Sequence, residues 1–264
     1  MTLGPVPAAN MVAMAVTLII SVGLPIALMI FALKKLRSKF YPFLIGCGVM
    51  LVMALILESI VHRIVFSATG TAITGNIWIL ALYGGLMAAL FEETGRFIAM
   101  KFFMKKDLNF PNGFMYGVGH GGFEAIALVG LTYIGNLSTS LMINSGTFEQ
   151  SLNLLPEETR ELTVAQISAL WTSGPDIFYA AGVERIAAIA LQIGMSLIMY
   201  KAVKSGKLGL AMISFLIHFV VDFAIVVINA QLGTWPCEIA TLILSASTIV
   251  IALNLNKDEE KATP

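Results

Sequence analysis

Seven ionisable side chains lie inside long apolar stretches of the sequence, where a charge is costly. They fall in the motifs FEETGRF, GHGGFEAI and HFVVD, and they are Glu92, Glu93, Arg96, His120, Glu124, His218 and Asp222. A charged side chain near the centre of a membrane helix costs about 2.5–3.5 kcal/mol on insertion scales. Such residues are therefore rare unless they form ion pairs or have a function. Carboxylates and imidazoles together move protons or bind divalent metal ions. The set therefore predicts one chemical or ion-handling site.

Spacing arranges these residues in pairs. The pairs are His120 with Glu124, His218 with Asp222, and Glu92 with Arg96, each four positions apart. Residues four apart lie on one face of a helix, so each pair can point toward the same neighbour. An imidazole that binds a metal or moves a proton usually needs an acceptor on its other nitrogen, and Glu124 or Asp222 can serve.

Charge counting favours a cation at this site. With neutral histidines, four carboxylates and one arginine leave the cluster at −3. A divalent cation reduces this charge, and two histidines with a carboxylate are a recognised ligand set for catalytic zinc. The candidate metal ligands are Glu92, His120, Glu124 and His218. Without a metal, carboxylates can still act as general base and acid on a trapped water, so both chemistries stay open. Glu93 with Arg96 is equally well explained as an interhelical salt bridge that positions the site.

Seven apolar runs, each long enough to cross about 30 Å of hydrocarbon, predict an all-α bundle of transmembrane helices. They cover about residues 11–33, 42–62, 77–100, 113–136, 177–200, 208–230 and 236–255. Of the 264 residues, 58% are hydrophobic and 12% are charged, so a lipid bilayer is the natural solvent. The formal net charge is zero, which excludes the basic field of a nucleic-acid-binding protein. We expect one integral domain over residues 1–264, multi-pass in the cell membrane.

The loops between these runs differ sharply in charge. One set carries Lys34, Lys35, Arg37, Lys39, Lys101, Lys105, Lys106, Lys201, Lys204, Lys207, Lys257 and Lys261. The opposite loops hold only Arg160, so the positive-inside rule predicts an outer N-terminus and a cytoplasmic C-terminus. The outer segment of about residues 137–176 is long for a connector and predicts an amphipathic helix from Pro156. This segment is either a plain outer loop or a lid over the bundle.

The three motifs are predicted to lie at the same depth in the bilayer. Counted inward at 1.5 Å per residue, Glu92 lies ~13 Å from Lys101, His120 ~12 Å from Asn112, and His218 ~16 Å from Lys207. Because these levels agree in three antiparallel runs, we expect one site. It should lie nearer the cytoplasm and be reached from the cytoplasmic half of the bundle.

Other polar residues within the spans have a plainer explanation. Glu58, His62 and Arg63 in the second run, and Glu184 with Arg185 in the fifth, lie nearer the outer surface. Pairing at the membrane interface accounts for them, and Glu58 or Glu184 can also extend a polar cavity toward the site.

Small residues in the spans indicate packing. Gly113, Gly117 and Gly121 form a stripe at four-residue spacing that permits close helix approach. Cys47 and Cys237 lie in runs whose topology places them toward opposite membrane faces, too far apart for a disulfide, so we expect two free packing residues.

At these motifs the sequence resembles the CAAX protease and bacteriocin-processing (CPBP) superfamily of intramembrane proteases, and more closely its YhfC-like branch of intramembrane metalloproteases. The matching residues, in family order over about residues 84–222, are Glu92-Glu93 with Arg96, Tyr116 with His120, and His218 with Asp222. Glu124, four residues after His120, is similar to the YhfC-type variant. The resemblance implies proteolysis within or beside the membrane, with a water activated by Glu92 or, as the second choice, Glu93. It also implies that His120 and His218 hold a metal or stabilise the oxyanion, and that Asp222 supports that oxyanion or orients His218.

The leading hypothesis is an intramembrane peptidase that hydrolyses a peptide bond of a membrane peptide or protein, by a glutamate-activated water with histidine and metal assistance. Its catalytic candidates are Glu92, Glu93, Arg96, His120, His218 and Asp222. The alternative is an ion or proton-coupled transporter, because buried carboxylates and histidines also form proton relays. The absence of internal repeats in the sequence favours the peptidase.

Overall fold

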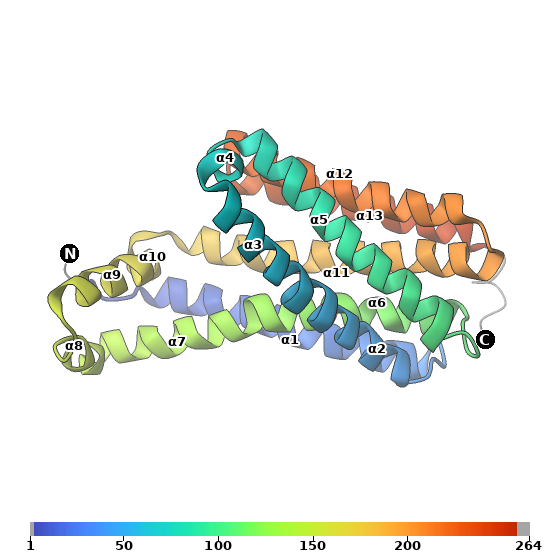
Figure 1. The fold of residues 1–264 in the computed structure, drawn as a ribbon. Coiled ribbons are helices and arrows are strands. Elements are labelled where there is room, and N and C mark those ends of the chain that lie inside the picture. Colours follow the sequence, from blue (N-terminus) through green and yellow to red (C-terminus); the bar gives the residue numbers. More distant parts are fainter. Residues whose placement is uncertain (1–2, 258–264) are drawn as a thin grey trace.

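The computed structural model describes residues 3–257 and is a bundle of long helices (Figure 1). Within these residues every regular element is helical. Seven helices of this described part are long and apolar enough to cross a membrane: Ala8–Lys34, Tyr41–Thr69, Ile77–Phe103, Phe110–Asn144, Pro175–Ser205, Leu208–Leu232 and Thr234–Leu255. The predicted all-α class and number of spans are therefore confirmed.

Three of the spans contain short π-helical segments. In chain order the α-helices are α1 (Ala8–Lys34), α2 (Tyr41–Val49), α3 (Ser59–Thr69), α4 (Thr71–Thr74), α5 (Ile77–Ile98), α6 (Phe110–Glu124), α7 (Leu131–Asn144), α8 (Thr147–Leu152), α9 (Glu157–Ile167), α10 (Ala169–Thr172), α11 (Pro175–Ser205), α12 (Leu208–Leu232) and α13 (Thr234–Leu255). Met50–Glu58 joins α2 to α3, Ala99–Phe103 extends α5, and Ala125–Gly130 joins α6 to α7, all as π-helix. Such segments are rare and frequently border functional sites. Met50–Glu58 ends at the buried Glu58, and Ala125–Gly130 begins directly after the half-buried Glu124.

Local sequence sets where the helices that carry the motifs begin and end. The side chain of Asn76 accepts hydrogen bonds from the backbone N–H groups of Trp78 and Ile79 and so caps α5. Asn109 caps α6 in the same way, directly before a first turn that contains proline. Gly233, with φ of 87°, makes the tight turn between α12 and α13 in a conformation that favours glycine.

Residues 137–176 fold mostly into helices. The fourth span continues as α7 to Asn144 instead of ending near residue 136, and α8, α9 and α10 follow before α11 begins at Pro175. The helix predicted from Pro156 is present, as α9 with Pro156 at its N-cap. In Figure 1 these short helices lie together at one end of the bundle, beside the start of α1. Val6, Leu170 and Phe178 share one apolar cluster there, so this segment is packed onto the bundle.

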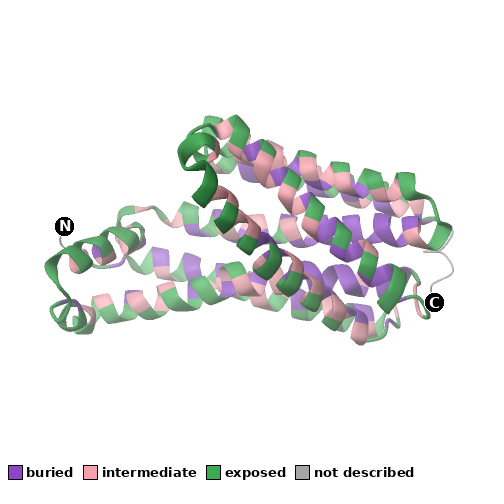
Figure 2. Ribbon diagram, in the orientation of Figure 1, coloured by how far each residue is buried: buried purple, intermediate pink, exposed green. Residues whose placement is uncertain are grey.

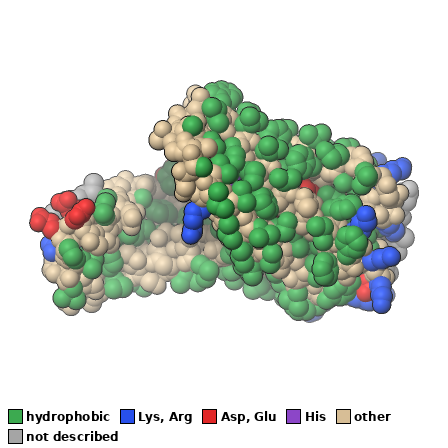
Figure 3. All heavy atoms as spheres, in the orientation of Figure 1, with side chains coloured by type: hydrophobic (Ala, Val, Ile, Leu, Met, Phe, Trp, Pro, Cys, Tyr) green, Lys and Arg blue, Asp and Glu red, His purple; other side chains and the backbone are tan. Residues whose placement is uncertain are grey.

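The two ends of the bundle differ in charge (Figure 3). We call the end with residues 34–39, 101–107 and 201–207 the lysine-rich end, and the end with α4, α8–α10 and the α12–α13 turn the lysine-poor end. Lys261, which belongs to the predicted basic set, lies outside the described residues. Lys39 Nζ lies 2.8 Å from Asp107 Oδ1, and this contact holds the pKa of the Asp107 carboxyl below its ordinary value. Two of the lysine-rich loops are thereby joined.

The glycine stripe packs α6 closely against α11. A Cβ atom on Gly117 would lie 2.7 Å from Ile193 Cα, and one on Gly113 would lie 3.1 Å from Tyr200 Cβ. At Gly121 the nearest neighbour would be Gln192 Cβ, at 2.9 Å. The stripe is therefore a packing surface, as expected for small residues at this spacing. It brings the His120 motif against the middle of α11.

α11 is the central helix of the bundle. Of its most apolar 18-residue stretch, 72% is buried, against 17–33% for the other spans. Figure 2 shows buried residues gathered on α11 and α6 in the half of the bundle next to the lysine-rich end. A membrane helix with so little lipid contact can carry polar side chains at low cost, because they face other helices.

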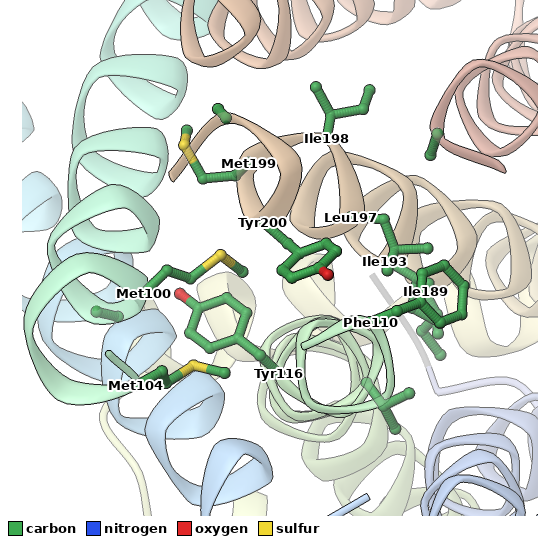
Figure 4. Close-up of a cluster of buried hydrophobic side chains, with 14 of the residues drawn as sticks. Met100, Met104, Phe110, Tyr116, Ile189, Ile193, Leu197, Ile198, Met199 and Tyr200 are labelled. Carbon is green, nitrogen blue, oxygen red and sulfur yellow. The ribbon is translucent and has the colours of Figure 1, made fainter. Parts of the chain in front are cut away.

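A tightly packed apolar cluster fills that half of the bundle (Figure 4). Five of its members, which we call the apolar plug, are at most 1% exposed: Met100, Met104, Tyr116, Leu197 and Tyr200. Met100 and Met104 lie at and just after the end of the third span, Tyr116 lies in the fourth span, and Leu197 and Tyr200 lie in the fifth. The plug separates the middle of the bundle from the lysine-rich loops.

Candidate active site

The three motifs converge in the middle of the bundle. Glu92 comes from α5, His120 from α6 and His218 from α12. His120 Nε2 lies 2.8 Å from Glu92 Oε2, and His218 Nε2 lies 3.9 Å from the same oxygen. All three residues are buried, at 7%, 0% and 2% exposure. The three side chains that the sequence predicts at one depth therefore meet.

Glu93 holds the second histidine from the other side. His218 Nδ1 lies 3.0 Å from Glu93 Oε1, and Ser214 Oγ donates to Glu93 Oε2 at 2.6 Å. Arg96 forms a buried ion pair with Glu93 and donates to the Gln192 side chain. Glu92 and Arg96 both lie on the buried side of α5, as their four-residue spacing predicts. The predicted salt bridge of Glu93 with Arg96 is present, but the prediction that it joins two helices is wrong, because both residues lie on α5.

Asp222 lies beside the same histidine. Its Oδ2 is 3.4 Å from His218 Nε2, as the four-residue spacing predicts. If the Nδ1 proton is directed to Glu93, Nε2 of a neutral imidazole presents a lone pair toward two carboxylates, Asp222 and Glu92. These three acceptors face one another at 3.4–3.9 Å, so a proton or a metal ion between them would be stabilising.

Gln192 of α11 ties the motifs together and was missed by sequence reasoning. Its Nε2 donates to Glu92 Oε2 at 2.9 Å and to Glu124 Oε2 at 3.2 Å, while its Oε1 accepts from Arg96. The residue is 5% exposed. A signal was present in the sequence, because Arg185 and Gln192 are seven apart, two helical turns, on one face of an apolar span.

Glu124 pairs with α11 and not with the histidine one turn before it. Arg185 Nη1 donates to Glu124 Oε1 at 3.0 Å, and Arg185 also forms an ion pair with Glu184. The expectation that Glu124 fixes the His120 ring is wrong, since His120 bonds to Glu92 and its Nδ1 has no hydrogen-bond partner in the described chain. The predicted pairing of Glu184 with Arg185 is confirmed, and both residues line the cavity next to the site. Arg185 is 7% exposed and neutralises two carboxylates next to the site.

Glu58 forms a separate polar contact on the second span. His62 Nε2 lies 3.0 Å from Glu58 Oε1, and His62 Nδ1 lies 2.9 Å from the Tyr83 hydroxyl. The predicted local pairing of Glu58 with His62 is confirmed. Glu58 is 8% exposed and lies within electrostatic range of Glu92, His218 and Asp222.

A polar cavity of about 300 Å³ adjoins the converged residues. Glu92, Glu124, Gln192, His218 and Asp222 contribute to its wall. Its remaining lining comes from residues that lie on α5, α11, α12 and α13 toward the lysine-poor end. The expectation that the site is reached from the cytoplasmic, lysine-rich half is therefore not met by this cavity, which runs the other way because the apolar plug fills that half.

The side chains at this cavity fit a divalent metal by their chemistry. Within residues 3–257 no three His, Cys, Asp or Glu side chains already form a metal-binding group. Even so, the Nε2 atoms of His120 and His218 both face Glu92 Oε2, and Asp222 borders the second of them. Two imidazoles and two carboxylates are the donor types of catalytic zinc sites.

Comparison with known proteins assigns the chain to a family. The family model described as YhfC intramembrane metalloprotease matches residues 20–243, which include all three motifs. The chain belongs to the YhfC family. A YhfC relative from Bacillus subtilis (strain 168), "Uncharacterized membrane protein YhfC", is 38% identical over 198 residues, which cover 74% of this chain and 76% of the relative. No solved structure matches. With its seven apolar helices, this YhfC-family chain is a multi-pass membrane protein.

Both cysteines of the chain are free, as predicted. Cys47 Sγ donates to the Gly119 carbonyl and Cys237 Sγ to the Ile225 carbonyl, so each links two helices weakly. Neither cysteine lies among the converged residues.

Proposed function

We propose that this YhfC-family protein is an intramembrane peptidase that hydrolyses a peptide bond of a membrane-associated peptide or protein. The observation that carries the proposal is the convergence of Glu92, His120 and His218 from three helices at the wall of one polar cavity. The family description and the resemblance to the CPBP superfamily support the same reaction class. Buried carboxylates and imidazoles at a cavity inside a membrane bundle are costly, and hydrolysis is a function that uses both.

Glu92 is the better candidate for the general base. Its carboxylate lines the cavity, where a water can reach it. Glu93 does not line the cavity, and its two oxygens already accept from Arg96, His218 and Ser214. We therefore assign Glu92 to accept the proton of the attacking water and to return it to the leaving nitrogen. Glu93 and Arg96 position His218 and Gln192.

The metal, when bound, would be held by His120 and His218 with a carboxylate and would polarise the scissile carbonyl and the attacking water. Asp222 is a better third ligand than Glu124 on this geometry, since Asp222 faces His218 Nε2 while Glu124 is engaged by Arg185. Glu93 directs the ring of His218 through Nδ1, an arrangement common for metal-binding histidines. Gln192 keeps the Glu92 carboxylate oriented through a 2.9 Å hydrogen bond.

Hydrolysis is favoured over transport by the family description, which names a metalloprotease. In the described residues the polar cavity lies on one side of Glu92, and the other side is filled by the apolar plug. A one-sided polar cavity suffices for a peptidase.

The proposal is tested by three variants in proteoliposomes: Glu92→Gln, His120→Ala and His218→Ala. The purified proteins are mixed with a library of membrane-anchored reporter peptides, and new peptide ends are counted by mass spectrometry. Loss of a positioned proton-transfer group costs about 10²–10⁴-fold in rate, so cleavage should vanish in each variant.

The matched control is Glu149→Gln on α8, which removes one exposed carboxylate far along the chain from the motifs. It should cleave at the wild-type rate. Full activity in all three site variants would refute the assignment, and cleavage-free flux of protons or ions that depends on Glu92 and His120 would replace it with transport.

A further inference from the structure

A second cavity continues the first one toward the lysine-poor end. It has a volume of about 420 Å³, and it shares four lining residues with the active-site cavity: Glu184, Ile225, Val226 and Thr241. Its other lining residues include Ile77 at the start of α5 and Thr234 at the start of α13. The two cavities therefore lie in series between the site and that end of the bundle, and we call them together the outer passage.

Polar side chains line the outer passage along its length. Glu238 and Thr241 of α13 lie ~6 Å and ~10 Å from the helix start, and Glu92 lies ~22 Å from the start of α5. Glu238 is 8% exposed, and its Oε2 has no hydrogen-bond partner in the described residues. Buried polar groups without a protein partner are commonly satisfied by ordered water, and the adjoining cavity of about 420 Å³ has room for it.

The opposite route is closed by packing. Between Glu92 and the lysine-rich loops, the apolar plug fills the space with side chains that are at most 1% exposed. Figure 4 shows this cluster, with Met100, Tyr116 and Tyr200 turned into the middle of the bundle. The route from the site to the lysine-rich end is the shorter one, ~13 Å from Glu92 to Lys101 along α5, but the plug fills it.

We propose that water and substrate reach Glu92 from the lysine-poor end, through the outer passage. Lysine-rich loops mark the cytoplasmic side by the positive-inside rule, so the lysine-poor end is extracytoplasmic. The substrate is then a polypeptide segment exposed on the extracytoplasmic side of a membrane protein or lipid-bound peptide. This statement of substrate side rests on the proposed peptidase function, whereas the route for water does not.

The route is tested by cysteine accessibility, which requires no cleavage. In a background with Cys47→Ser and Cys237→Ser, single cysteines are placed in the outer passage, in the plug and at the two ends. The variants are Asn229→Cys, Glu238→Cys and Thr241→Cys in the passage, Met100→Cys in the plug, Lys105→Cys at the lysine-rich end and Glu157→Cys at the lysine-poor end. Sealed cell-derived vesicles of both orientations are treated with a membrane-impermeant maleimide.

In vesicles whose orientation exposes Glu157→Cys to the maleimide, the passage cysteines should be labelled as well. Met100→Cys should react only after denaturation. Labelling of the passage cysteines together with Lys105→Cys would overturn the route. So would passage cysteines that stay unreacted in opened vesicles where both end cysteines react. Labelling of Glu157→Cys from the cytoplasmic side would overturn the extracytoplasmic assignment.

A blocking variant gives a second, independent reading. Gly84 lines the passage, and a Cβ there would meet nothing within 4 Å, so Gly84→Trp can fill the passage without disturbing the packing. It should abolish labelling of Ala188→Cys, which lies deeper in the same cavity. The matched control is Gly135→Trp on α7, where a Cβ also meets nothing within 4 Å. Unchanged labelling of Ala188→Cys with Gly84→Trp would contradict the route, and cleavage assays on the same variant report separately on the peptidase.

Discussion

Arg96 offers a direct test of the charge balance at the centre of the bundle. Its side chain is 0% exposed and is paired with Glu93, which is 3% exposed. Removal of one partner of such a pair leaves an uncompensated buried charge and costs about 3–5 kcal/mol. Glu93 keeps two donors, Ser214 and His218, so Arg96→Met should fall at the lower limit, about 3 kcal/mol.

That loss corresponds to a fall in thermal midpoint of roughly 6–12 °C for a domain of this size. The assay is thermal unfolding in detergent, with Arg96→Met compared with the double variant Arg96→Met, Glu93→Gln. The double variant removes both charges and should recover part of the loss. The matched control is Arg63→Met at an exposed position of α3, with an effect within about 0.5 kcal/mol. If Arg96→Met were as stable as this control, the argument for a buried, mutually dependent charge pair would be refuted.

Three further outcomes follow from packing and hydrogen bonding. Gly117→Leu should lower the thermal midpoint, because overpacking against Ile193 costs about 1–3 kcal/mol, and an unchanged midpoint would contradict the close α6–α11 contact. Gln192→Leu should lower kcat/KM for reporter cleavage by about 10–100-fold, as for other residues that orient a catalytic group, and a wild-type value would exclude its role in orienting the base. Replacement of Cys47 and Cys237 together by serine should leave cleavage intact in the presence or absence of reductant, whereas a redox-dependent rate in the wild type would reveal an unexpected disulfide.

Most of the fold was predictable because the bilayer imposes a length on each apolar run. The seven spans follow from that length alone, and the structure confirms them. The ends of the helices were less predictable. An apolar run ends at the hydrocarbon boundary, but backbone hydrogen bonding can continue the helix beyond it. Thus α7 runs on to Asn144, beyond the predicted end of its span. The π-helical segments, such as Met50–Glu58, have no signature in hydrophobic periodicity and were not predicted.

The candidate site was predictable as a set, but its pairing only in part: His218 with Asp222 was expected, whereas Glu124 with Arg185 was not. The costs of buried charge and the common depth identified Glu92, His120 and His218 as neighbours. Which carboxylate meets which cation depends on helix rotation and on the neighbouring helix, and neither is visible in four-residue spacing. Gln192 illustrates the limit, because a neutral amide in an apolar span has no charge penalty to attract notice, yet its hydrogen bonds join Arg96 to Glu92.

We propose that His120 and His218 together with Glu92 form one metal-dependent hydrolytic centre inside the membrane. Metal analysis of the detergent-purified protein tests it most directly, with the wild type measured beside the double variant His120→Ala, His218→Ala. The claim predicts a stoichiometric divalent metal, zinc in the first place, in the wild type and its loss in the double variant, with both proteins folded by thermal unfolding. A wild type without metal after purification in zinc-supplemented buffer, or a double variant that retains the metal, would contradict it.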